Sequence, residues 1–345
     1  MRKNVSLLQI FVQINVAISY KLVQKNVDMK RNVLSKLIDW KNKKNRKPLI
    51  LNGARQVGKT YILREFGSQC YEKMAYVNCD KNKMLEKIFS QDYNISRILL
   101  SLSAILHVNI EPGNTLIIFD EIQESPTVLN SLKYFCEDAP QYHVAVAGSL
   151  LGISLHNNTS FPVGKVDMIK MYPMTFDEFL MAIGEQPLVD ILATKDFSII
   201  DSLSVRFIDC LRQYYYVGGM PAAVAEFAST KNLEEVRNIQ KQILFDYRRD
   251  FSKHAPSQEV PRINMVWDSI PAQLAKENKK FIFGALKKGA RASEFEIAIQ
   301  WLLDAGLIYQ INRITTPSIP LKFYEEMSVF KLFVLDIGLM GAMSD

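Results

Sequence analysis

The chain has 345 residues, of which 48% are hydrophobic and 23% are charged, so it is long enough for two or three domains and is not a disordered or low-complexity protein. Its 42 lysines and arginines against 36 aspartates and glutamates give a net charge of +6, which permits a nucleic-acid partner but does not indicate a dedicated nucleic-acid binder. The four cysteines are widely spaced, which argues against a zinc site and predicts reduced thiols in a cytoplasmic protein.

The first 28 residues imitate a signal peptide poorly. The apolar run at 7–12 is interrupted by glutamine, is too short to span a bilayer, and is followed by no clear cleavage site. We therefore interpret residues 1–28 as a poorly structured upstream extension, take Met29 as the natural start, and expect no membrane association. An amphipathic helix is expected from Met29, and the basic stretch 41–47 after it is interpreted as a solvated linker rather than a nucleic-acid contact.

A glycine-rich motif follows the apolar run Leu49–Leu51, which has the length and composition of a buried strand. Glycines allow the main chain to approach phosphate oxygens and to aim its N–H groups at them, so this motif predicts a P-loop. Lys59 would then contact the β- and γ-phosphates of a nucleotide, and the Thr60 hydroxyl would bind magnesium. The predicted nucleotide contacts are Gly53, Ala54, Arg55, Gln56, Val57, Gly58, Lys59, Thr60 and Tyr61.

Two carboxylates end a second apolar run, Leu116–Phe119. A buried parallel strand that delivers acids at its carboxyl end is typical of a Walker B motif. Asp120 would hold magnesium through water, and Glu121 would act as the general base that polarises the attacking water. Taken alone, the acidic pair could equally begin an ordinary helix; its pairing with the P-loop favours nucleotide binding and hydrolysis.

Further strand-like runs at 75–77, 144–147 and 166–171 alternate with helical segments. This alternation predicts an α/β fold with the parallel sheet of a P-loop NTPase, of the type with an additional strand. Ser149 follows the run at 144–147 and is either a catalytic sensor of the γ-phosphate or a helix cap. Thr175 and Glu178 stand at capping-box spacing and predict a helix start.

The rest of the chain is expected to form two smaller parts behind a core at 29–180. Residues 181–250 read as a helical lid subdomain, broken by a turn at 218–221. Helices at 263–278 and 292–305, followed by strands at 307–311 and 331–335, predict a winged helix in residues 251–345.

Together these motifs resemble the AAA-type ATPases of bacteria and archaea that carry an uncharacterised C-terminal domain. The resemblance covers about residue 30 to the end, and it implies an ATP-hydrolysing core, a winged helix and a distal module similar to restriction-type nucleases. It rests on Gly-Ala-Arg-Gln-Val-Gly-Lys-Thr at 53–60, Asp-Glu-Ile-Gln at 120–123, Gly-Ser at 148–149, Tyr-Pro-Met-Thr-Phe-Asp-Glu-Phe at 172–179, Gly-Gly-Met-Pro at 218–221 and Phe-Lys-Leu-Phe-Val-Leu-Asp-Ile-Gly-Leu at 330–339.

The sequence departs from that family in two places. Lys165 stands where relatives usually have arginine, and lysine does not reproduce the forked geometry of arginine at a possible trigger position. The chain also stops at Asp345, where relatives continue into the nuclease-like module. We therefore expect a C-terminally truncated product without a nuclease site.

Three functions compete. The leading one is ATP binding and magnesium-dependent hydrolysis that drives a conformational change, coupled to DNA, to a protein partner or to further copies of the chain. The second is a nucleotide-gated switch or DNA-binding module with little or no hydrolysis. A small-molecule kinase is disfavoured, because Glu121 beside Asp120 suits water activation and no arginine-rich lid is visible. The preference for ATP over GTP follows from the resemblance alone.

Basic residues near the predicted winged helix are candidate phosphate contacts for double-stranded DNA, or solvated residues of a module that packs on the ATPase core. They are Lys279, Lys280, Lys287, Lys288 and Arg291. Arg55 within the P-loop could touch nucleotide or a neighbouring subunit. Arg248 and Arg249 are expected to form surface ion pairs.

Overall fold

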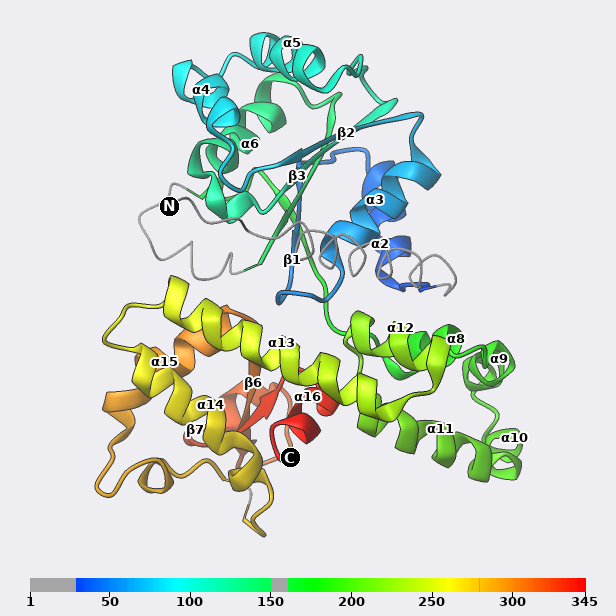
Figure 1. Cartoon of the computed structure of the whole chain (residues 1–345), viewed down its shortest axis with the longest axis vertical. Coiled ribbons are helices and arrows are strands. Elements are labelled where there is room, and N and C mark those ends of the chain that lie inside the picture. Colours follow the sequence, from blue (N-terminus) through cyan, green and yellow to red (C-terminus); the bar gives the residue numbers. More distant parts are fainter. Residues whose placement is uncertain (1–28, 150–160, 279) are drawn as a thin grey trace, which may run out of the picture.

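The structure is a computed structural model that describes residues 29–149, 161–278 and 280–345 (Figure 1). A five-stranded sheet with strand order β2-β3-β4-β1-β5 forms the core, and all its pairs are parallel. The strand β4 lies between β1, which leads into the P-loop, and β3, which ends in the acidic pair, as expected of the additional-strand type. The strands are β1 Leu49–Asn52, β2 Lys73–Asn78, β3 Thr115–Asp120, β4 His143–Gly148 and β5 Asp167–Lys170.

The burial of the strands follows from their place in the sheet. Every residue of β3 and β4 is buried, whereas the edge strands β2 and β5 have partly exposed positions. Central parallel strands are covered on both faces, which explains their uninterrupted apolar sequence. Successive residues point to opposite faces, so Ile118 belongs to one core cluster and Ile117 to another.

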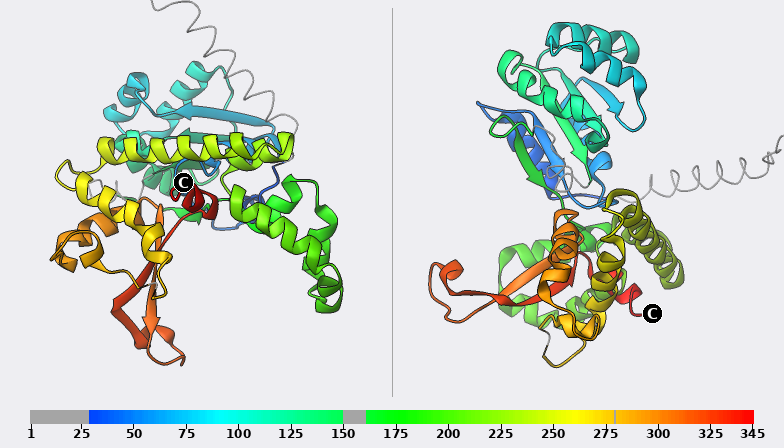
Figure 2. Two further views of the ribbon diagram at one scale, coloured as in Figure 1. Left: turned by 60° about the horizontal axis from the view of Figure 1, so that its bottom comes forward. Right: turned by 90° about the vertical axis from the view of Figure 1, so that its left-hand side faces the viewer.

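Helices cover both faces of this sheet (Figures 1 and 2). The face that contains Ile118 packs against α2 (Val33–Asn42) and α3 (Lys59–Cys70), and the opposite face packs against the next three helices. Those helices are α4 Lys83–Gln91, α5 Ile95–Leu106 and α6 Pro126–Asp138; the short 3-10 helix η1, Ile122–Glu124, precedes α6. The linker at 41–47 is fixed to the core, since Lys43 pairs with Asp167 at 2.6 Å.

A helical region follows β5. The predicted capping box is present at its start, because the Thr175 N–H donates to Glu178 Oε2 at 3.0 Å. The long helix α13 runs beneath the sheet layer in Figure 1 and continues through residue 250, so the boundary that we expected there falls inside a helix. The helices are α8 Phe176–Ala182, α9 Gln186–Thr194, α10 Phe197–Ser202, α11 Ser204–Val217, α12 Pro221–Thr230 and α13 Leu233–His254.

The C-terminal part contains the two expected helices, then the expected antiparallel hairpin, and it ends in a third helix. The Phe281 N–H donates to the Phe330 carbonyl at 2.8 Å, so the segment before α15 also touches the hairpin. Asp336 accepts the N–H groups of Leu339 and Gly219, which ties the last helix to the turn before α12. The elements are α14 Val260–Leu274, η2 Phe283–Ala285, α15 Ala292–Asp304, β6 Ile308–Ile314, η3 Leu321–Tyr324, β7 Glu325–Val334 and α16 Ile337–Ala342.

One hydrophobic core joins the sheet layer to the C-terminal part. Leu37 of α2, Trp267 of α14 and Leu339 of α16 are all fully buried members of the same cluster. Phe251 of α13 packs edge-on against Trp267, with ring centroids 5.8 Å apart. Within the described residues, no helix is both long and apolar enough to cross a membrane.

Candidate functional site

The loop between β1 and α3 has the geometry of a P-loop. Gly58 directly precedes α3 as its N-cap residue and has φ 95°, a left-handed conformation that glycine adopts without steric cost. A Cβ on Gly53 would lie 2.4 Å from the Met171 carbonyl oxygen, so only glycine fits there. Gln56 also has a positive φ, 67°, which is uncommon for a residue with a side chain.

Lys59 is buried at the centre of this loop. Its Nζ donates to the carbonyls of Gly53 at 2.9 Å and Ala54 at 2.8 Å. Burial lowers the pKa of Lys59 to about 8, although the carboxylates of Glu121 and Asp120 act in the opposite direction. The ammonium group is therefore held on the loop itself, at the place where phosphates would arrive.

Thr60 and Asp120 meet at the carboxyl edge of the sheet. The Thr60 hydroxyl donates to Asp120 Oδ2 at 2.7 Å, and the Tyr76 hydroxyl donates to the same oxygen at 2.8 Å. Burial, and then the hydrogen bond to Asp120, raise the pKa of Tyr76. A hydroxyl beside a carboxylate suits Mg²⁺, which takes one or two protein oxygens and keeps waters and phosphates as its other ligands.

Glu121 directly follows Asp120 in the sequence and has a left-handed φ of 53°. Its Oε2 accepts a hydrogen bond from Gln123 Nε2 at 2.5 Å, which fixes the direction of the carboxylate. Ser149 follows β4 and is 4% exposed. The residues that would show whether Ser149 caps a helix, 150–160, lie outside the described part of the chain.

These groups line one cavity of about 340 Å³. Of the predicted contacts, six P-loop or α3 residues line it together with both acids and Ser149, whereas Gly53, Ala54 and Val57 are buried and do not line it. Five lining residues were not anticipated. The cavity residues are Met29, Arg31, Arg55, Gln56, Gly58, Lys59, Thr60, Tyr61, Asp120, Glu121, Ser149, Pro221, Ala222 and Ala225.

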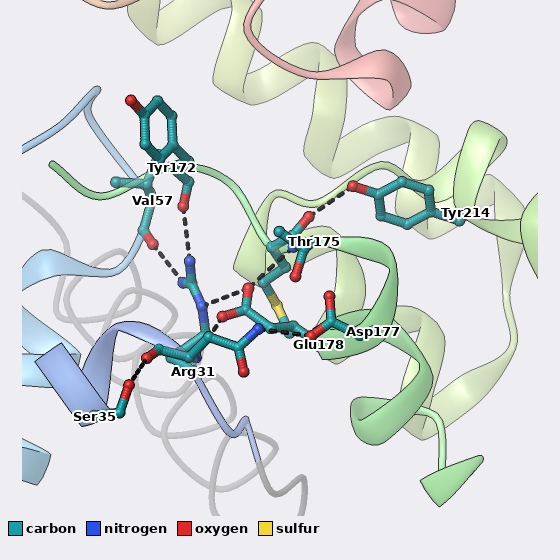
Figure 3. Close-up of polar contacts among 10 residues, drawn as sticks. Arg31, Ser35, Val57, Tyr172, Thr175, Asp177, Glu178 and Tyr214 are labelled. Atoms are coloured by element: carbon teal, nitrogen blue, oxygen red, sulfur yellow. Dashed lines mark hydrogen bonds and ion pairs between the residues drawn. The ribbon is translucent and has the colours of Figure 1, made fainter. Parts of the chain in front are cut away.

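Arg31 connects three segments beside this cavity (Figure 3). Its Nε lies 3.1 Å from Glu178 Oε2, and its two terminal nitrogens donate to the backbone carbonyls of Val57 at 2.9 Å and Tyr172 at 2.7 Å. No motif marks Arg31 in the sequence. The signal that could have found it is an arginine placed directly before an amphipathic helix.

The remaining candidate cations lie away from the cavity. Lys165 pairs with Glu137 at 2.8 Å, and Glu137 is near the end of α6. Arg248 pairs with Asp268 at 2.6 Å on the surface. Among the described residues, no group of three or more histidines, cysteines, aspartates and glutamates could hold a metal ion.

The candidate DNA contacts precede α15. Lys287, Lys288 and Arg291 are exposed, and Lys280 is half-buried. The exposed face of α15 itself carries Glu294 and Glu296, so the basic charge lies before the helix and acidic charge lies on it. Lys279 is outside the described residues.

Two family models match the chain. An AAA domain matches residues 45–180, and a domain of unknown function (DUF8612) matches residues 208–345. No curated protein matches the chain.

Similar solved structures include the Walker-type ATPase PABY2304 of Pyrococcus abyssi, with a TM-score of 0.59 and 14% identity over 92% of this chain and 96% of that one. The Aeropyrum pernix Orc1 protein in complex with DNA has a TM-score of 0.31 and 14% identity, over 91% of this chain and 90% of that one. The RuvB Holliday junction branch migration motor of Thermotoga maritima has a TM-score of 0.36 and 13% identity, over 82% of this chain and 90% of that one.

At such identities the first of these structures supports the fold alone, and the other two are too distant to support it. The P-loop, the acidic pair and the strand order agree with the domain model that matches residues 45–180. The chain therefore carries an AAA-type P-loop ATPase domain at residues 45–180, followed by an uncharacterised domain at residues 208–345.

Proposed function

We propose that the chain binds ATP with Mg²⁺ and hydrolyses it to drive a conformational change. The observation that carries the proposal is the convergence of Lys59, Thr60, Asp120 and Glu121 on one cavity of about 340 Å³. That volume is within the range of small-molecule and cofactor sites, roughly 300–1,000 Å³. The residues supply a cation, metal ligands and a carboxylate base, which are the groups that phosphoryl transfer to water requires.

Each residue has a role in this proposal. Lys59 exchanges the P-loop carbonyls for phosphate oxygens, and Ser149 donates a hydrogen bond to the γ-phosphate. Thr60 and Asp120 would hold Mg²⁺, which supplies positive charge to the phosphates. Glu121, directed by Gln123, accepts the proton of the attacking water.

Four apolar residues also line the cavity and suit a nucleotide base. Met29 precedes α2, and Pro221, Ala222 and Ala225 belong to α12. A base held between them would contact both the core and the helical region, so its arrival and departure would change how these parts pack. This is the conformational change that we attribute to the nucleotide.

Steady-state ATP hydrolysis by the full chain tests the proposal. Lys59→Ala, Glu121→Gln and Ser149→Ala are compared with the wild type, and ATP affinity is measured in parallel. We expect turnover by the wild type, loss of both binding and turnover in Lys59→Ala, and binding with at least about a hundredfold loss of turnover in Glu121→Gln. Binding without turnover by the wild type would instead support the nucleotide-gated switch.

Duplex DNA is included in the same assay because Lys287, Lys288 and Arg291 are exposed together. We propose this segment as the DNA contact. Stimulation of hydrolysis that weakens with salt and is lost in a Lys287→Ala/Lys288→Ala variant would support it. If the rate of hydrolysis at low salt is the same with and without DNA, hydrolysis would instead be coupled to a protein partner or to further copies of the chain.

A further inference from the structure

The long helix α13 contacts the P-loop directly, although it belongs to the matched domain of unknown function. The Tyr247 hydroxyl donates to the Arg55 carbonyl at 2.8 Å. The Arg55 guanidinium donates to Asp250 Oδ1 at 2.5 Å, and Gln56 Nε2 donates to Asp246 Oδ2 at 3.0 Å. Residues 246, 247 and 250 are spaced to share one helix face, and that face meets the loop.

Two of these helix residues are buried. Tyr247 is 1% exposed and packs edge-on against Trp267, with ring centroids 6.4 Å apart. Its hydroxyl would lack a partner in this interior without the Arg55 carbonyl, so the bond is costly to lose. Asp250 is 5% exposed, and burial raises its pKa while the charge of Arg55 opposes that effect.

The loop residues that α13 holds need external support. Gln56 has a φ of 67°, which costs free energy for a residue with a side chain and persists where the surroundings fix it. Arg55 and Gln56 both line the nucleotide cavity. The contacts of α13 with Arg55 and Gln56 therefore act on the shape of the site.

The same helix is anchored at its other end to the end of α11 and to the C-terminal helix α16. Gln240 Nε2 donates to the carbonyls of Tyr216 at 2.9 Å and Val217 at 2.8 Å. Arg237 donates to the Gly338 carbonyl of α16 at 3.2 Å. In Figures 1 and 2, α13 lies between the sheet layer and the C-terminal elements. A displacement of α16 or of the end of α11 would thus reach the P-loop through one helix.

We propose that Tyr247 and Asp250 are positioning residues of the nucleotide site, supplied by the uncharacterised domain, and that they set the affinity for ATP by fixing the P-loop. This inference rests on the proposed ATP binding. Because linkage is reciprocal, ATP bound in the loop also strengthens the docking of α13. The uncharacterised domain then contributes residues that position the nucleotide site, rather than only being attached to the ATPase domain.

The test compares Tyr247→Phe with a matched control, Tyr214→Phe, in the full chain. The half-buried Tyr214 also donates its hydroxyl to a backbone carbonyl, that of Met174 at 2.7 Å, but away from the P-loop. We measure the Kd for Mg·ATP and, without nucleotide, hydrogen exchange at residues 54–58. Tyr247→Phe is expected to weaken ATP binding about fivefold and to speed exchange in the loop, whereas Tyr214→Phe changes neither.

A second pair of variants tests the carboxylate. Asp250→Asn is expected to weaken ATP binding about threefold, and this effect should disappear in an Arg55→Ala background, because the two residues act together. Asp268→Asn, which removes the surface partner of Arg248, is the control and should leave the Kd unchanged.

The outcomes separate this inference from the proposed function. A wild type that binds no ATP overturns the proposed function, while exchange without nucleotide still decides whether α13 positions the loop. Equal Kd values and equal exchange in the wild type and Tyr247→Phe would overturn the inference. Equal losses in Tyr247→Phe and Tyr214→Phe would also overturn it, because they would reflect a general loss of stability.

Discussion

Arg31 and Glu178 form a buried ion pair in which Nε and Oε2 lie 3.1 Å apart, with the two side chains 5% and 4% exposed. Glu178 also accepts the backbone N–H groups of Asn32 at 2.6 Å and Thr175 at 3.0 Å. One carboxylate thereby fixes the segment before α2 to the start of α8, and Arg31 extends the link to the Val57 carbonyl of the P-loop. The segment that leads into the core and the segment that leaves it are therefore held together beside the nucleotide cavity.

Removing one partner of this pair should destabilise the protein strongly. Glu178→Gln leaves the Arg31 charge buried without compensation, and we expect a loss of about 3–5 kcal/mol in the free energy of unfolding. Chemical denaturation measures it. Asp177→Asn, which alters the exposed bond to Asn32, is the control and should cost less than about 1 kcal/mol. Similar small losses in both variants would contradict the prediction.

Lys59 should matter for binding and not for stability. A pKa lowered from 10.5 to about 8 corresponds to a cost of about 3 kcal/mol for the buried charge at pH 7. The two hydrogen bonds to the Gly53 and Ala54 carbonyls, at about 1.5 kcal/mol each, offset it.

Lys59→Met should therefore leave the thermal midpoint without nucleotide within about 3 °C of the wild type, while ATP affinity falls at least about a hundredfold. Thermal unfolding with and without Mg·ATP measures both. A large drop in the midpoint without nucleotide would show that the lysine is mainly a structural residue.

Tyr76→Phe should weaken the binding of magnesium at the site without changing the binding of metal-free ATP. The variant removes one of the two hydroxyls that direct Asp120 Oδ2, while Arg64, 3.9 Å from the ring centroid, keeps the ring in place. We expect the magnesium concentration for half-maximal activity to rise about three- to tenfold, with binding of metal-free ATP unchanged. Tyr134→Phe alters a ring that stacks on Tyr93 and should match the wild type. A shift in metal-free binding would argue against the assignment.

His143 should make the fold sensitive to mild acid. Burial, and then the charges of Arg46 and Lys41, lower its pKa from 6.5 to about 4. Between these values the unfolded chain binds a proton that the folded chain does not, so stability falls as the pH drops from about 6.5 towards 4. The Tyr71 hydroxyl lies 2.7 Å from His143 Nδ1, and this hydrogen bond fixes the position of the imidazole ring.

Thermal midpoints of the wild type and His143→Gln at pH 7.5 and pH 5 measure this effect. Groups common to both chains cancel in the comparison, so the variant should lose less stability than the wild type over the same interval. Parallel losses would place the acid sensitivity elsewhere.

The parts of the site that the sequence predicts are those encoded in local motifs at strand ends. Asp120 ends a buried strand, and Lys59, Glu121 and Ser149 lie beyond the ends of buried strands; adjacent parallel strands bring their carboxyl ends together. Arg31 and Ala225 lie in the same cavity but come from the segment before α2 and from α12, and no spacing in the sequence relates them to the P-loop.

The fold shows the same contrast. The five strands were predicted to within a few residues because buried apolar runs are easy to recognise. The first half of β7 was not predicted, since Glu325 to Ser328 are largely exposed and show no apolar alternation. The boundary expected at 250 falls within α13 because Tyr247 and Phe251 continue one buried helix face across it.

The shared core has a consequence for how this chain can be divided. The two family matches leave residues 181–207 unmatched, and this gap is where the chain would ordinarily be divided into two fragments for expression. Yet Leu37 and Leu339 belong to one continuous interior, and a fragment ending at 180 would uncover the face of α2 and α3 that the later helices cover. The family matches divide the chain into two parts, but the folded chain shares one hydrophobic core. The intact polypeptide should melt in one cooperative transition, and the excised core should be recovered mainly as aggregate.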